Sequence, residues 1–255
     1  MIVGAAKELR DRRDDEPAFV LHVYPYRETS VIVEAFTAGA GRVAMVARGA
    51  KRPRSELRGL LCAFQPLTLS WAGTSELKTL LKAEWRGGLP LPTGPALLCG
   101  FYLNELLLKL LPREDPHPGL WAHYEATLAA LTQTTVAADQ AAILRRFELR
   151  LLAELGYAMP LSRTASGEAV QPGERYHYAF ERGPLTAAEP GARYPVVRGE
   201  TLLALADERY GDARVAAEAR ELMRSVLDHY LEERRIFSRR VVRDLQALDE
   251  ERETP

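Results

Sequence analysis

The sequence predicts an α+β protein in which a small β-barrel precedes an α-helical region. Up to residue 85 the chain is a series of short apolar segments, rich in β-branched residues and separated by polar, Gly or Pro turns, which is typical of strands. After a Gly- and Pro-rich stretch at 87–95, apolar residues recur at helical spacing. Hydrophobic residues make up 47% of the chain and charged residues 27%, an ordinary balance for a globular protein.

Five strands and one short helix are expected before residue 87. The strands cover residues 18–26, 30–36, 42–48, 66–71 and 77–85, and Ser55 is a candidate cap for a helix that reaches residue 61. Three strands, a short helix and two further strands form the layout of an OB-fold, a small partly open barrel whose face binds single strands. An SH3-like barrel is the competing layout, but it normally lacks the helix before the fourth strand.

The Gly- and Pro-rich stretch is the expected domain boundary, because linkers of this composition separate compact units. We expect a flexible tail at 1–16, an OB-fold domain at 17–86, a helical domain at 95–248 and a second tail at 249–255. Residues 157–200 lose the helical pattern and form a loop-rich insert with short strands. Asp139 and Asp212 are candidate caps for two of the helices.

Composition excludes several classes of protein. The two cysteines, Cys62 and Cys99, lie among apolar residues, so they are expected to be small buried hydrophobes and not a disulfide framework. No segment reaches the roughly 18 charge-free apolar residues of a membrane-spanning helix. The start of the chain lacks an apolar signal core, so a cytoplasmic location is expected.

Positive charge is concentrated in one segment, residues 42–58, although the whole chain has a net charge of only -1. Six basic residues stand there against the single acid Glu56: Arg42, Arg48, Lys51, Arg52, Arg54 and Arg58. Such a cluster attracts polyanions, and nucleic acid is the usual partner because neutralised phosphates release counterions. The alternative is a protein-interaction scaffold whose barrel binds an acidic protein surface.

No catalytic set is recognisable. The five histidines lie in separate segments, and none has helical metal-ligand spacing to another. Gly39 and Gly41 precede a strand pattern, whereas a dinucleotide-binding glycine loop must open a helix. The sequence therefore predicts a protein that is not an enzyme and that carries no cofactor.

Four segments, in order along nearly the whole chain, resemble the bacterial RecO recombination mediators. They are AFVLHVYPYRETSVIVEAFTAGAGRVAMVARGAKR, FYLNELLLKLL, RRFELRLLAELGY and SVLDHYLEERRIFSRRVVRDL. The resemblance implies an OB-fold followed by a helical domain, sequence-independent binding of single- and double-stranded DNA, annealing of complementary strands and help in loading RecA. The implied partners are RecR and the single-stranded-DNA-binding protein, with RecA indirect and RecF left open, in a cytoplasmic, nucleoid-associated setting.

Two further expectations follow from this resemblance. Many members hold zinc through cysteines after the LGY motif, but residues 157–199 contain no cysteine, so we expect no metal and a degenerate, zinc-free insert. In similar proteins the acidic tail of the single-stranded-DNA-binding protein docks on the helical domain. Arg145 matches the basic position of the RRFE motif, with Leu103 and Leu144 as candidate apolar neighbours.

Overall fold

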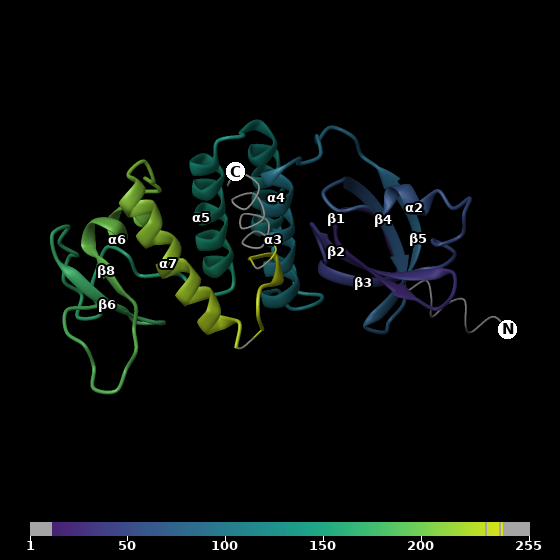
Figure 1. Ribbon diagram of the computed structural model, residues 1–255. Helices are drawn as coiled ribbons and strands as arrows, with labels where there is room; N and C mark the ends of the chain where they lie inside the picture. The colour runs from purple at the N-terminus through teal and green to yellow at the C-terminus, as the bar shows by residue number, and fades with distance from the viewer. Residues whose placement is uncertain (1–11, 233, 240, 242–255) are drawn as a thin grey trace. The chain divides into compact units, whose positions relative to one another are not determined.

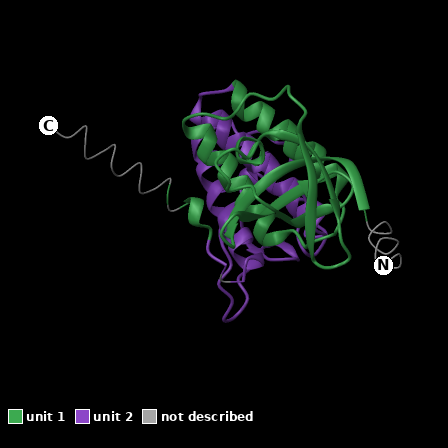
Figure 2. Cartoon of the chain, turned by 90° about the vertical axis from the view of Figure 1, so that its right-hand side faces the viewer, with its two compact units in different colours: residues 1–133, 236–255 green, residues 134–235 purple. Residues whose placement is uncertain are grey.

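The computed structural model describes residues 12–232, 234–239 and 241, and Figure 1 shows the order of their elements. The described residues divide into two compact units (Figure 2). Unit 1 contains the residues up to Gln133 and those from Ile236 onward, and unit 2 contains Thr134–Arg235.

Unit 1 begins with a closed five-stranded barrel. Its strands are β1 (Arg12–Tyr26), β2 (Ser30–Thr37), β3 (Gly41–Ala47), β4 (Pro66–Ala72) and β5 (Leu77–Trp85), and the short helix α2 (Leu57–Leu60) joins β3 to β4. The strand order β1-β2-β3-β5-β4, with β3 and β5 parallel, confirms the predicted OB-fold. β1 begins at Arg12, so part of the segment expected to be a tail is a paired strand.

Period-2 alternation explains the core of the barrel, because successive strand residues face opposite sides of the sheet. Val31, Val33 and Ala35 of β2 meet Val43, Met45 and Ala47 of β3 in one buried apolar cluster. Leu67, Leu69 and Trp71 of β4 complete it. Strand periodicity therefore accounts for one buried face on each of these three strands.

Two helices of unit 1 pack on the outside of the barrel. They are α3 (Pro95–Leu110) and α4 (Pro118–Gln133). Phe19 of β1 and its cross-strand neighbour Phe36 of β2 both place their rings edge-on against Tyr124 of α4, with centroids 5.3 and 6.1 Å away. The buried Asn104 of α3 donates to the Leu21 carbonyl at 2.9 Å and accepts from the Tyr124 hydroxyl. These contacts join α3 and α4 to the barrel.

Unit 2 combines a small sheet with α-helices. It contains α5 (Ala137–Glu154), β6 (Arg175–Ala179), β7 (Gly183–Leu185), β8 (Val196–Arg198), α6 (Gly199–Ala206) and α7 (Ala213–Tyr230). The strands pair in the order β7-β6-β8. Asp212 caps α7 as predicted, since its carboxylate accepts from the backbone N–H groups of Arg214 and Val215, each at 2.9 Å.

Some expectations about single residues were wrong. Asp139 lies inside the first turn of α5, and Val136 is the N-cap residue. Cys62, which follows α2, is exposed, and Cys99 of α3 (Pro95–Leu110) is only half-buried. The tail expected at 249–255 and most of the last expected helix lie outside the described residues. Among the described helices, none combines the length and apolar character needed to cross a membrane.

Candidate nucleic-acid interface

The candidate interface is the segment that connects β3 to α2. Five exposed basic residues lie on it or in α2, and we call them the loop cations: Arg48, Lys51, Arg52, Arg54 and Arg58. The predicted cluster is therefore at the surface, at the end of the barrel where β3 finishes. Arg42, the sixth predicted member, lies in a different environment.

Backbone hydrogen bonds hold this segment in a compact series of turns. Gly49 adopts φ +72°, a left-handed conformation that favours glycine. The Lys51 N–H donates to the Thr29 carbonyl, and the Lys51 ammonium donates to the Arg27 carbonyl, both at 2.9 Å. The connection between β1 and β2 is thus fixed beside the loop cations. An ammonium has three donors, so Lys51 keeps capacity for an anion.

The loop cations are not neutralised by the fold. Within the part of the chain that the structure describes, no carboxylate lies within ion-pair distance of any of them. Glu56 remains the only acid on the segment. A solvated cluster of one sign raises the local concentration of polyanions. Phosphate groups are the ligands that such arginine-rich surfaces suit best.

Arg27 joins this surface, and sequence reasoning missed it. It is exposed at the β1–β2 turn with φ +52°, and its guanidinium lies over the Tyr26 ring, 5.1 Å from the centroid. The signal in the sequence was the hairpin itself, because the turn of the first hairpin meets the end of the third strand when β2 pairs with both neighbours.

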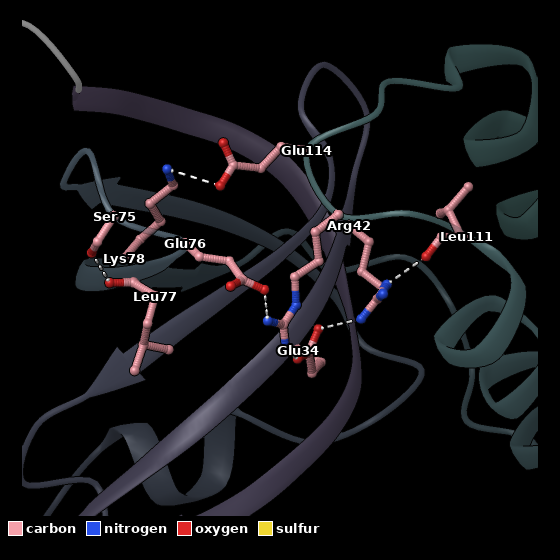
Figure 3. Close-up of polar contacts among 9 residues, drawn as sticks. Glu34, Arg42, Ser75, Glu76, Leu77, Lys78, Leu111 and Glu114 are labelled. Atoms are coloured by element: carbon pink, nitrogen blue, oxygen red, sulfur yellow. Dashed lines mark hydrogen bonds and ion pairs between the residues drawn. The ribbon is translucent and has the colours of Figure 1, made fainter.

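Arg42 is committed to the interior of unit 1. Its guanidinium donates to the Glu34 carboxylate and to the Leu111 carbonyl, each at 2.9 Å, and its side chain is only 15% exposed (Figure 3). Glu34 is almost completely buried and also pairs with Arg113. Because its donors are already directed at these acceptors, Arg42 is not grouped with the loop cations.

Residues 111–115, which we call the strap, hold the Glu34 network together (Figure 3). The Glu114 N–H donates to the Arg42 carbonyl at 2.9 Å, and the Glu114 carboxylate pairs with Lys78 of β5 at 2.9 Å. Arg113 bridges Glu34 and Glu76. Hydrogen bonding to Glu34 raises the pKa of Arg113 above its ordinary value, despite partial burial.

The strap limits where a ligand can contact the barrel. A side chain at Gly41 would meet the backbone of Asp115, with a Cβ only 2.0 Å from its carbonyl oxygen. OB-folds generally bind oligonucleotides on the β2–β3 face and the adjoining loops. Here the strap covers that face around Glu34 and Arg42, which leaves the loop cations as the accessible basic surface.

Three aromatic residues of β1 and β2 differ in their availability for stacking on nucleobases. Tyr24 is 43% exposed and packs on His22 with ring centroids 4.4 Å apart. Tyr26 lies under Arg27, whereas Phe36 is fully buried against α4. Phe36 is therefore not available for base stacking in this fold, and Tyr24 and Tyr26 are.

The residues expected to bind an acidic protein tail lie in two units. Leu103 belongs to α3 of unit 1 and is fully buried. Leu144 and Arg145 belong to α5 of unit 2, where both are half-buried. Arg145 pairs with the fully buried Glu148 at 2.5 Å, while its Nε has no hydrogen-bond partner among the described residues. The arginine is thus partly occupied by its own helix.

A metal centre is not formed by the side chains that the structure describes. Within residues 12–232, 234–239 and 241, no three His, Cys, Asp or Glu side chains are placed to hold a metal ion. The cysteine-free insert is held instead by apolar burial, with Tyr176, Tyr178 and Val197 of its sheet inaccessible to solvent.

Comparison with known proteins agrees with the geometry. Residues 14–88 match the family model described as Recombination protein O N terminal, and residues 91–235 match Recombination protein O C terminal. The DNA repair protein RecO of Dechloromonas aromatica is 49% identical over 240 residues, which cover 94% of this chain and 99% of the relative. That of Nitrosospira multiformis is 50% identical over 242 residues, covering 94% and 98%. The chain therefore belongs to the recombination protein O family, RecO.

Proposed function

We propose that this chain acts in DNA repair and recombination as a mediator that binds DNA without sequence preference. The observation that carries the proposal is the exposed, unneutralised set of loop cations at one end of an OB-fold barrel. Contacts to phosphate position a nucleic acid but do not read its bases, so a surface of this kind accepts any sequence.

The proposed activity is mechanical and makes or breaks no covalent bond. By holding two strands close together, the loop cations would reduce the repulsion between their phosphates, and complementary strands would anneal. With RecR, the protein would help to load RecA onto DNA that is coated by single-stranded-DNA-binding protein. The two family models together cover the barrel and most of the described helices, which supports this whole-chain role.

Substitution of three loop cations tests the DNA contact. Changing Arg48, Lys51 and Arg52 to Ala should weaken binding of a labelled single strand in fluorescence anisotropy. The slope of log affinity against log salt should fall by about 0.7 for each phosphate interaction removed, which is roughly 2 for three such interactions.

A matched control removes the same charge elsewhere. Arg175, Arg193 and Arg209 are exposed residues of unit 2, and changing all three to Ala alters net charge equally. This control should keep the wild-type salt slope. Equal weakening in the two triple variants would show that binding follows net charge and not the loop, and the proposed contact would be abandoned.

We further propose that α5 receives the acidic tail of the single-stranded-DNA-binding protein through Arg145 and Leu144. The half-buried guanidinium of Arg145 supports this, because it carries five N–H donors and a second carboxylate can accept from those not directed at Glu148. Leu103 is left out because it is fully buried. Two weak contacts on one chain, one to tail and one to strand, would reinforce each other through effective concentration.

The tail proposal is tested with an acidic peptide that ends in an aromatic residue. Arg145→Lys keeps the charge beside Glu148 but removes the guanidinium fork, so peptide binding should weaken while binding of bare DNA is unchanged. If peptide and DNA binding fall together, the chain does not carry two separate sites.

A further inference from the structure

A small cavity opens next to the loop cations. It lies between the start of β2, the loop after β3 and α2, and its volume is about 180 Å³. The lining residues are Val31, Ala50, Lys51, Leu57, Arg58 and Leu61. Several waters would fit, since each takes about 30 Å³ in the liquid. The cavity is smaller than the roughly 300 Å³ of a site for a drug-sized ligand, so it suits a single ring system.

The cavity has an apolar floor and a cationic entrance. Val31, Ala50 and Leu61 belong to the buried barrel core, and Leu57 packs against it. Lys51 and Arg58 are exposed, and among the described residues that line the cavity there is no carboxylate. Lys51 is held in place by its two bonds to the β1–β2 turn. The cavity thus combines a place for a flat apolar group with two cations for the charges beside it.

We propose that this cavity takes one unstacked nucleobase of a single strand, while Lys51 and Arg58 bind the phosphates on either side of it. The inference rests on the proposed DNA contact and gives it a preference for single strands. Bases in a duplex are stacked and paired, so one can enter an apolar pocket only after flipping, which costs a few kcal/mol. A single strand offers its bases without that cost.

The charges around the cavity favour a nucleic acid over an acidic peptide. An acidic peptide would need only the cavity for one apolar side chain, and Lys51 and Arg58 for the carboxylate beside it. Arg48, Arg52 and Arg54 extend the positive surface along the loop, outside the cavity lining. A repeating series of cations matches a ligand whose negative charge also repeats, and phosphodiester chains have that property.

The first test needs no substitution. Wild-type protein is titrated with three labelled probes: a mixed-sequence single strand of about 20 nucleotides, the matching duplex, and a single strand of the same length whose bases are replaced by abasic sites. The abasic strand keeps every phosphate, so it should bind about tenfold more weakly than the natural strand with an unchanged salt slope. Equal affinity of the natural and abasic strands would overturn the proposal.

Substitutions in the cavity give the second test. Ala50→Leu fills the floor and Leu57→Gln removes an apolar wall, and each should lower single-strand affinity about tenfold while leaving duplex affinity within about twofold. Arg54→Ala is the matched control from the same loop, since Arg54 does not line the cavity. It should weaken both probes alike and reduce the salt slope. Intact folding of each variant is checked by tryptophan fluorescence.

The outcomes separate this inference from the function on which it rests. If wild-type protein binds none of the three probes, the DNA contact itself is wrong. If strands bind but cavity variants weaken single strand and duplex equally, the DNA contact is retained and the base-binding cavity is wrong. Cavity variants that no longer bind an acidic peptide but still bind the single strand would also overturn the proposal, in favour of a protein occupant.

Discussion

Arg42→Ala should destabilise unit 1 instead of weakening its DNA contact. The substitution removes a charge-assisted bond to a carboxylate that is only 3% exposed, together with a bond to the Leu111 carbonyl. Among the described residues, it leaves Arg113 as the only cation still paired with Glu34. Bonds to charged groups contribute about 1.5–3 kcal/mol and ordinary ones about 1 kcal/mol, and breaking a buried pair costs about 3–5 kcal/mol. We therefore expect the free energy of unfolding to fall by about 3 kcal/mol.

Tryptophan fluorescence is the appropriate assay, because all three tryptophans of the chain, Trp71, Trp85 and Trp121, lie in unit 1. For a unit of this size, a destabilisation of about 3 kcal/mol should lower its Tm by about 6–12 °C. Arg54→Ala is the control: it removes an exposed guanidinium without a carboxylate partner among the described residues, so its stability should change by less than about 0.5 kcal/mol.

The two substitutions should affect DNA binding in the opposite order to stability. Well below the unfolding transition, Arg42→Ala should bind a single strand within about twofold of wild type, whereas Arg54→Ala should bind more weakly and with a lower salt slope. If Arg42→Ala proves as stable as wild type and its affinity falls like that of a loop-cation variant, the assignment of Arg42 to the interior is wrong. In a double-mutant cycle with Glu34→Ala, the coupling should be at least about 1 kcal/mol.

Three further predictions concern other parts of the chain. Asp212→Ala should cost about 1 kcal/mol by removing the cap of α7, seen as faster amide exchange in its first turn; unchanged exchange would mean that the cap is dispensable. Burial raises the pKa of Glu105, but hydrogen bonds from the backbone of Ser238 and Phe237 outweigh it, so the pKa lies below its ordinary value of 4.5. The stabilisation by ionised Glu105 is complete above its unfolded-state pKa and disappears as pH falls through the lower folded-state pKa. The backbone amide resonances of Phe237 and Ser238 should therefore shift below pH 4.5. In the control variant Glu105→Gln they should not shift. Burial raises the pKa of Tyr210 to about 12, and its buried hydroxyl has no hydrogen-bond partner among the described residues. Tyr210→Phe should therefore leave the free energy of unfolding unchanged or raise it by up to about 1 kcal/mol, as measured by thermal unfolding. A clear destabilisation would show that the hydroxyl does make a hydrogen bond.

Local pattern was sufficient for the elements of the barrel. The segments rich in β-branched residues became the five strands, and the helix between β3 and β4 distinguished an OB-fold from an SH3-like barrel. Pattern failed for Asp139, because the helix begins before it: Val136 is the N-cap residue and Asp139 lies inside the first turn of α5. The boundaries expected between the domains stay a prediction.

By itself, the sequence determined the barrel, the family and the position of an unusually basic segment, because each depends on residues that are near one another in the chain. Only the tertiary structure decided which basic residues are available. Arg42 is held by Glu34, which lies eight residues earlier but beside it across the β2–β3 pair, and by a strap that follows a helix. Arg27 and the cavity at Ala50 likewise result from strand pairing. When strands pair, residues that are far apart in the chain come to lie side by side. No local sequence pattern could therefore assign those roles.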